Sequence, residues 1–120
     1  MKVAITSTGT TLDADADPRF GRAEYFVIVD PDTMEYDVIE NKQNLELPQG
    51  AGIQAGRTIV NQKVSALITG FCGPKAFKVL KSANIQILVG AKGKIRDIIE
   101  KYKKGELETA DQANVEGHWA

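Results

Sequence analysis

Cys72, the only cysteine of the chain, has the position that most favours metal or nucleophile chemistry. It lies in the segment GFCGPKA at residues 70–76, between a short apolar run and a helical pattern. Pro74 suits the first position of a helix, so Gly73 is the expected cap and Cys72 lies just before it. Unpaired N–H groups at a helix start lower a thiol's pKa, which predicts a reactive thiol or metal ligand. The alternative is a small buried hydrophobe in a tight turn.

A loop with two arginines is a candidate anion contact. The segment DPRFGRA at residues 17–23 places the arginines around a Phe-Gly pair, as Arg19, Phe20, Gly21 and Arg22. Guanidinium groups bind anions through charge and hydrogen bonds, and glycine permits a close approach of the backbone to a ligand. The alternative is a solvated loop in which one arginine pairs with Asp15 or Asp17.

Glycines recur at the junctions between the expected strands and helices: Gly50, Gly52, Gly70, Gly73, Gly90 and Gly93. The N–H groups at such junctions can bind an anion at a helix start, which makes Gly50, Gly52, Gly70 and Gly73 candidate cofactor contacts. The plainer explanation is that strand-to-helix turns use glycine whatever they bind. The set does not match GxxxxGK[ST] or GxGxxG, so no nucleotide is predicted.

His118 is the only histidine and the second candidate metal ligand, although a tail residue is more often simply solvated. Cys72 and His118 together are too few for a tetrahedral zinc site, which needs about four protein ligands, or three plus water. A cluster that brings its own sulfides needs fewer protein ligands. The sparse set therefore suits that class of cargo better.

Three alternating aspartates, Asp13, Asp15 and Asp17, raise the alternative of a two-metal nuclease. That chemistry needs carboxylates from several strands converging on two cations roughly 4 Å apart. Here the carboxylates are clustered in one loop, and the first expected strand, residues 2–7, carries none. We therefore expect no nuclease activity.

The hydrophobic pattern predicts the elements that must position these side chains. Strands are expected at residues 2–7, 24–30 and 34–41, the last two as a hairpin. Helices and strands then alternate, with helices at residues 52–62, 74–83 and 94–104 and strands at residues 66–69 and 85–89. The strands that begin near residues 2, 66 and 85 should lie side by side and parallel.

The expected fold is therefore α/β, a ribonuclease H-like three-layer fold with a mixed five-stranded sheet and the order β-β-β-α-β-α-β-α. Ligands of open sheets bind beyond the carboxyl ends of the parallel strands. The loops that begin at Ser7, Gly70 and Gly90 lie at that end, and Cys72 with them. One domain is predicted over residues 1–107, followed by a flexible C-terminal tail at residues 108–120.

Composition limits the class of protein. The chain has 120 residues, 42% of them hydrophobic, which fits a single core, and a net charge of -1, which gives no overall footprint for nucleic acid or an anionic membrane. The lysine-rich residues 92–104 are most simply a solvated face, with a docking patch for an acidic partner as the alternative. No membrane-spanning run or signal peptide is recognised and the cysteine has no internal partner, so we expect a cytoplasmic protein.

Three segments together resemble the dinitrogenase iron-molybdenum cofactor biosynthesis family, which includes NifX, NafY and the C-terminal part of NifB. Residues 17–23, with the strand after them, are similar to the family's HFGxA-type loop. Residues 50–55, GAGIQA, resemble its glycine-bearing helix entry, and residues 70–76 resemble its GPxA turn. With the final GEL at residues 105–107, the resemblance spans nearly the whole chain and indicates a single NifX-like domain.

The resemblance implies a ribonuclease H-like fold and the carrying of preformed metal-sulfur clusters. It implies that the Arg19 loop, the turn at residues 50–54 and the turn at residues 70–75 surround the cluster. Nitrogenase-associated members often place a histidine where this chain has Arg19, and a guanidinium cannot ligate a metal. The cysteine-bearing turn looks more like the stand-alone members, among which a molybdenum-copper sulfide cluster occurs.

We therefore predict a non-enzymatic binding or carrier protein for an iron-molybdenum-sulfur or molybdenum-copper-sulfur cluster, with a protein donor or acceptor of that cluster as partner. Arg19, Arg22 and the turn N–H groups would hold the charge, and Cys72 is the leading candidate ligand. The alternative is a metal-free regulatory or interaction module of the same fold that binds a small anion or a protein partner. Both a monomer and a homodimer are compatible with the sequence.

Overall fold

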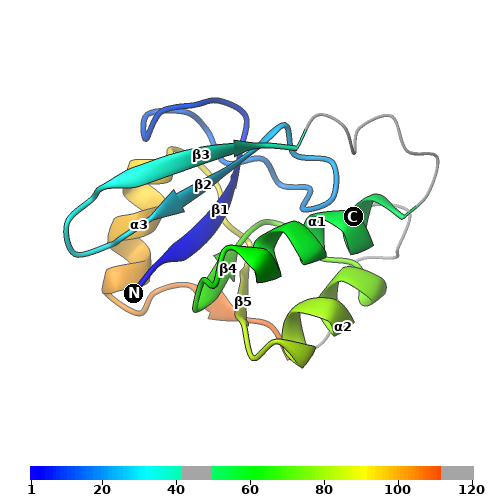
Figure 1. Cartoon of the computed structure of the whole chain (residues 1–120). Helices are drawn as coiled ribbons and strands as arrows, with labels where there is room; N and C mark the ends of the chain where they lie inside the picture. The colour runs from blue at the N-terminus through cyan, green and yellow to red at the C-terminus, as the bar shows by residue number, and fades with distance from the viewer. Residues whose placement is uncertain (42–49, 112–120) are drawn as a thin grey trace.

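The computed structural model describes residues 1–41 and 50–111 (Figure 1). Its elements are β1 (Val3–Ser7), β2 (Tyr25–Val29), β3 (Tyr36–Glu40), α1 (Ala51–Asn61), β4 (Ala66–Ile68), α2 (Pro74–Ser82), β5 (Gln86–Val89), α3 (Ile95–Lys103) and β6 (Glu108–Thr109). Every strand and helix predicted within residues 1–107 is present, with ends that differ by two residues at most. The mixed α/β class is confirmed.

The strands form one sheet in the order β3-β2-β1-β4-β5-β6. β1 is parallel to β4, with Val3 opposite Ala66, and β4 is parallel to β5, with Ala66 opposite Gln86. β2 runs antiparallel to both β1 and β3. The predicted hairpin and the three adjacent parallel strands are therefore confirmed, and the parallel strands end on one side of the sheet.

The sheet has six strands, so the predicted five-stranded sheet is wrong in number. β6 pairs antiparallel with β5, with Leu88 opposite Thr109, and the N–H of the buried Ala110 donates to the carbonyl oxygen of Ile87 at 2.8 Å. The sequence showed no strand here because both β6 side chains are polar and exposed, so neither contributes to an apolar pattern. Residues 108 and 109, predicted as the start of a loose tail, belong to the sheet. Residues 112–120, which include His118, lie outside the described residues.

Two separate apolar clusters make the fold three layers deep. On one face of the sheet, Ile59 of α1 and Leu80 of α2 pack with Ala4 of β1. On the other face, Ile98 and Ile99 of α3 pack with the neighbouring β1 residues Val3 and Ile5. Successive strand residues point to opposite faces, so a strand that is apolar at every position is buried between two helical layers. Within residues 1–41 and 50–111, no helix is both long and apolar enough to cross a membrane.

Candidate functional site

A pocket of about 560 Å³ lies at the carboxyl ends of the parallel strands. The loop after β1 contributes Ala16 and Pro18, the loop after β4 contributes Gly70 and Phe71, and the loop after β5 contributes residues 90–93. These are the loops that the sequence assigned to the site. Two charges of opposite sign, Asp15 and Lys92, also line the pocket, so its wall is not uniformly cationic.

Backbone hydrogen bonds join the three loops into one unit. The N–H of Phe71 donates to the carbonyl oxygen of Pro18 at 2.6 Å, and the N–H of Phe20 donates to that of Phe71 at 3.3 Å. The N–H of Gly90 donates to the carbonyl oxygen of Gly70 at 3.2 Å. A Cβ on Gly70 would lie 2.8 Å from both Cα and O of Pro18, so only glycine allows this approach.

Asp17 anchors the arginine loop. Its Oδ1 accepts a hydrogen bond from the N–H of Arg19 at 2.9 Å and lies 3.8 Å from Nε of the same residue. The Asp17 side chain is 8% exposed and that of Arg19 is 53% exposed, so the guanidinium stays at the surface. Burial raises the pKa of Asp17, the N–H and charge of Arg19 oppose that rise, and Glu24 adds to it. The alternative that one arginine pairs with Asp17 is therefore confirmed for Arg19.

The other residues predicted in this loop differ in their surroundings. Phe20 is fully buried and stacks at a tilt on Phe26, with ring centroids 5.7 Å apart, so it supports the loop from the core. Gly21 is buried and Arg22 is partly exposed. The side-chain amide of Asn41 donates to the carbonyl oxygens of Gly21 at 3.3 Å and Ala23 at 2.8 Å. Sequence reasoning missed Asn41, whose only signal was a polar residue directly after the alternating strand β3.

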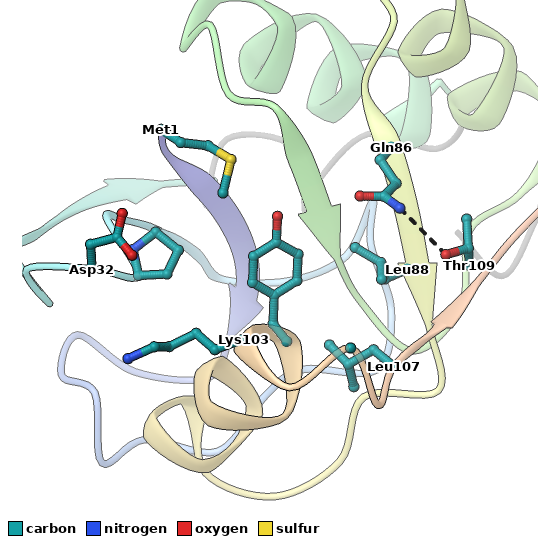
Figure 2. Close-up of a pocket in the computed structure, with 10 residues that line it drawn as sticks. Met1, Asp32, Gln86, Leu88, Lys103, Leu107 and Thr109 are labelled. Atoms are coloured by element: carbon teal, nitrogen blue, oxygen red, sulfur yellow. Dashed lines mark hydrogen bonds between the residues drawn. The ribbon is translucent and has the colours of Figure 1, made fainter.

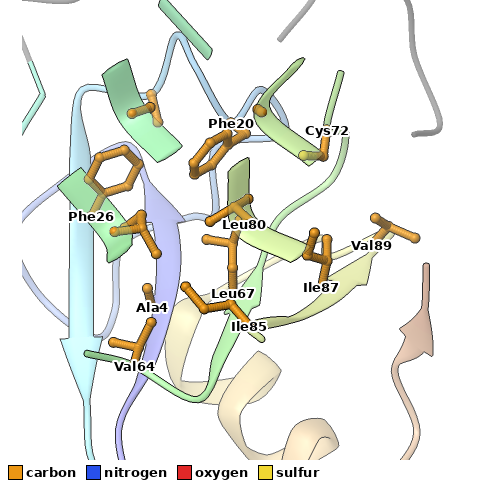
Figure 3. Close-up of a cluster of buried hydrophobic side chains, with 14 of the residues drawn as sticks. Ala4, Phe20, Phe26, Val64, Leu67, Cys72, Leu80, Ile85, Ile87 and Val89 are labelled. Carbon is orange, nitrogen blue, oxygen red and sulfur yellow. The ribbon is translucent and has the colours of Figure 1, made fainter. Parts of the chain in front are cut away.

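Cys72 is fully buried, and the predicted direction of its pKa shift is wrong. Figure 3 shows its sulfur in the apolar cluster that also contains Phe20, Leu80 and Ile87. Burial raises the pKa of the thiol from 9.0 to about 12, because the apolar surroundings disfavour the thiolate. Proximity to a helix start was read correctly, but the side chain points into the core. A ligand role for Cys72 stays a prediction.

The helix starts at this end differ in their N–H groups. α1 begins after Gly50, whose φ is 84°, and α2 begins after Gly73; neither helix has an acidic residue in its first turn or a side-chain cap. α3 instead carries Asp97, and the N–H groups of Ile95 and Arg96 donate to loop carbonyl oxygens at 2.9 and 2.8 Å. The first turns of α1, which contains Gly52, and of α2 are therefore the more open to an anion.

Side-chain metal ligands do not gather at the pocket. Within the described ranges, no three His, Cys, Asp or Glu side chains form a group that could hold a metal ion. Asp13 instead accepts a hydrogen bond from Nε of Arg96 at 3.2 Å. This donor set suits an anion held by charge and N–H groups better than a bare cation held by side chains.

A second pocket, of about 510 Å³, lies at the opposite end of the parallel strands (Figure 2). Met1, the turn residue Asp32 and Gln86 at the start of β5 line it, together with Lys103 of α3. Gln86 donates a hydrogen bond to the hydroxyl of Thr109 across its rim at 3.4 Å. None of the residues that the sequence assigned to a site lines this pocket.

Comparisons with known proteins agree with these features. Residues 1–105 match the family model described as "Dinitrogenase iron-molybdenum cofactor". The chain is 32% identical over 113 residues to an uncharacterized protein of Methanocaldococcus jannaschii, and the alignment covers 90% of each chain.

Two solved structures are similar over nearly their whole length. The apo form of the orange protein from Desulfovibrio gigas has a TM-score of 0.92 and 35% identity, with 95% of this chain and 96% of that chain covered. A Thermotoga protein solved by NMR, named as a NifB candidate of the DUF35 family, has a TM-score of 0.82 and 32% identity, with coverages of 97% and 98%.

Proposed function

Because the chain belongs to the dinitrogenase iron-molybdenum cofactor family, we propose that it binds and carries an anionic metal-sulfur cluster at the carboxyl end of its sheet. The role is that of a non-enzymatic carrier in the cytoplasm, which takes the cluster from one protein and passes it to another. We also propose that the fold is of the ribonuclease H-like type. A molybdenum-copper sulfide or an iron-molybdenum-sulfur cluster is the proposed cargo.

The observation that carries this proposal is the gathering of cationic and N–H donor groups at one end of the sheet. The exposed guanidinium of Arg19 lies on a loop that is hydrogen-bonded to the turn before α2. The first turns of α1 and α2 add helix N-termini without acidic residues. A sulfide-rich cluster supplies its own metal ligands, so the protein needs mainly to match its charge and shape.

The alternative is a metal-free module that binds a small anion at the same place. Two observations favour it: the neutral, buried thiol of Cys72, and a donor set within the described ranges that has no three-residue metal group. Both candidate functions use the same arginine loop and helix starts. They differ in whether metal and sulfide remain bound.

Reconstitution separates the two functions. The purified protein is incubated with tetrathiomolybdate and copper(I), or with iron and sulfide, and then passed through a desalting column. A carrier retains metal in stoichiometric amounts and shows charge-transfer bands in the visible. Retention of no metal under any of these conditions, with molybdate or phosphate still bound, would support the metal-free module instead.

The arginine loop gives the first prediction. Arg19→Ala should weaken binding of tetrathiomolybdate by about tenfold, because a hydrogen bond to a charged group contributes about 1.5–3 kcal/mol and solvent exposure reduces this. Arg22→Ala should weaken it less, since Arg22 is less exposed than Arg19 and therefore less accessible to a ligand. The affinity is measured by absorption titration. Arg57→Ala, an exposed arginine within α1, is the matched control and should leave the affinity unchanged.

Asp17 gives the second prediction. Its carboxylate competes for Arg19, so Asp17→Asn should raise the affinity for tetrathiomolybdate severalfold while the amide oxygen still accepts the N–H of Arg19. The raised pKa of Asp17 means that its stabilising contribution is present at low pH and lost as pH rises through the folded-state pKa. At pH 7.5 the free energy of unfolding of the variant, measured in urea, should therefore be no lower than that of the wild type. A weaker affinity in this variant would contradict the competition.

A further inference from the structure

The net charge of the chain is close to zero, but its basic and acidic residues are concentrated in different segments. Residues 50–83, which contain α1 and α2, carry no acidic side chain and five basic ones: Arg57, Lys63, Lys75, Lys78 and Lys81. Residues 24–40, which contain the β2–β3 hairpin, carry no basic side chain and six acidic ones: Glu24, Asp30, Asp32, Glu35, Asp37 and Glu40. One part of the molecule is therefore cationic and another anionic.

The cationic part has an ordered centre on α2. Lys75, Lys78 and Lys81, which we call the α2 lysine row, are all exposed and follow one another at intervals of three residues. Such residues are neighbours on a helix surface, about 4.5 Å apart along its axis. None of the three pairs with a carboxylate of residues 1–41 or 50–111. Lys81 Nζ lies over the ring of Phe77, 5.9 Å from its centroid, but no carboxylate in these ranges offsets the charge of the row.

The basic residues of α3 are different. Asp97 and Glu100 lie on the same helix, Lys103 is 3.8 Å from Glu100, and Arg96 is 3.2 Å from Asp13. Carboxylates close by offset these cations. The sequence allowed a docking patch for an acidic partner at residues 92–104. Because the cations there are offset, α2 is the better location for such a patch.

The α2 lysine row begins beside the proposed cluster site. Lys75 is the second residue of α2, which follows the turn at residues 70–73. In that turn Phe71 is 44% exposed, although it is a large apolar side chain. Figure 1 shows α2 at the margin of its layer, where a partner could approach it from outside. An exposed aromatic next to a charged row is typical of protein interfaces, in which aromatic anchors bind and charges steer.

We propose that Phe71 and the α2 lysine row form the docking surface for an acidic protein, the one that supplies or receives the cluster; this rests on the proposed function. The row matches a surface of regularly spaced carboxylates, and the acidic hairpin orients the approach by repelling the same partner. A long nucleic acid would also meet the hairpin, and the row has no arginine fork for phosphate. A membrane would need a broader apolar face than one exposed phenylalanine.

The test uses a short, helical, glutamate-rich peptide as the probe, titrated into the isotope-labelled protein and followed by NMR. The amide signals of α2 should move, and the affinity should fall as salt is added. Lys78→Glu/Lys81→Glu should weaken binding by about tenfold or more, since both contacts become repulsive. Lys101→Glu/Lys104→Glu, an exposed lysine pair with the same spacing on and just after α3, is the matched control and should change the affinity less than twofold.

The same pair of variants separates this proposal from the proposed function. Lys78 and Lys81 lie along α2 and away from the cluster pocket, so their double variant should still load metal and sulfide fully. If the peptide binds α2 but the protein loads no cluster, the proposed cargo is wrong and the proposed docking surface stands. Equal effects of the α2 and α3 pairs, or equally tight binding of a DNA duplex or of phosphatidylglycerol vesicles to α2, would overturn the docking surface.

Discussion

Cys72 is expected to react with a thiol reagent roughly a thousandfold more slowly in the folded protein than in the unfolded chain at pH 8. Only the thiolate is nucleophilic, and each unit of pKa above the pH reduces its population tenfold. Burial raises the pKa of this thiol from 9.0 to about 12, and its side chain is fully buried as well. The rates are compared with iodoacetamide in buffer and in urea, with mass spectrometry counting the modified chains.

The control for this experiment is the unfolding rate itself. If modification follows the rate at which the protein opens, the folded thiol is inert and Cys72 acts as a core residue. Fast modification of the folded protein would show that the sulfur reaches solvent as a thiolate. That result would restore Cys72 as a covalent ligand of the cluster, because a metal needs the deprotonated sulfur.

The same burial makes stability fall at high pH. The folded-state pKa lies above the unfolded one, so the contribution of the neutral thiol is complete below about pH 9 and is lost as pH rises towards 12. At pH 10.5 the loss amounts to about 2 kcal/mol of unfolding free energy. The measurement compares urea unfolding of the wild type with that of Cys72→Ala at pH 8 and 10.5, so that the effects of all other groups cancel. The variant should lose about 2 kcal/mol less.

Most of the fold could be predicted because its elements carry their own apolar pattern. The spacing of Ile95, Ile98 and Ile99 marks the buried face of α3, and alternation in β3 marks a sheet edge. β6 could not be predicted, since Glu108 and Thr109 are exposed and are held by backbone pairing with β5 and one side-chain hydrogen bond from Gln86. Hydrophobic periodicity identifies elements that bury side chains, so it cannot identify a strand that buries none.

The sequence predicted where the site lies more successfully than it predicted which groups are in contact there. Parallel topology places the loops after β1, β4 and β5 together, and that argument holds for any sequence with this pattern. The direction of the Cys72 side chain depends on the core beneath the turn, and so did its pKa. The pairing of Asp17 with Arg19, two residues away, was among the alternatives that the sequence allowed. The amide of Asn41 holds the same loop through Gly21 and Ala23, which are distant in the sequence, and local spacing does not reveal such contacts.

Gly70→Ala is expected to destabilise the protein by about 2–4 kcal/mol and to abolish anion binding with it. The added Cβ would lie 2.8 Å from two backbone atoms of Pro18, which cannot rotate away as a side chain could. Overpacking of this kind costs about 1–3 kcal/mol. Moving the loop would also break the hydrogen bond between the N–H of Phe71 and the carbonyl oxygen of Pro18, worth about 1 kcal/mol.

Gly56→Ala provides the matched comparison for Gly70→Ala. Its Cβ would lie 3.1 Å from Cγ1 of Val79, a side-chain atom that can shift, and alanine favours the helix by about 1 kcal/mol over glycine. The stability of this variant should stay within about 1 kcal/mol of the wild type, with anion binding intact. Equal losses in the two variants would mean that glycine's smallness matters throughout the fold. A loss confined to Gly70→Ala, with NMR shifts at Arg19 and Phe71, would show that the contact between these loops holds the arginine where an anion can reach it.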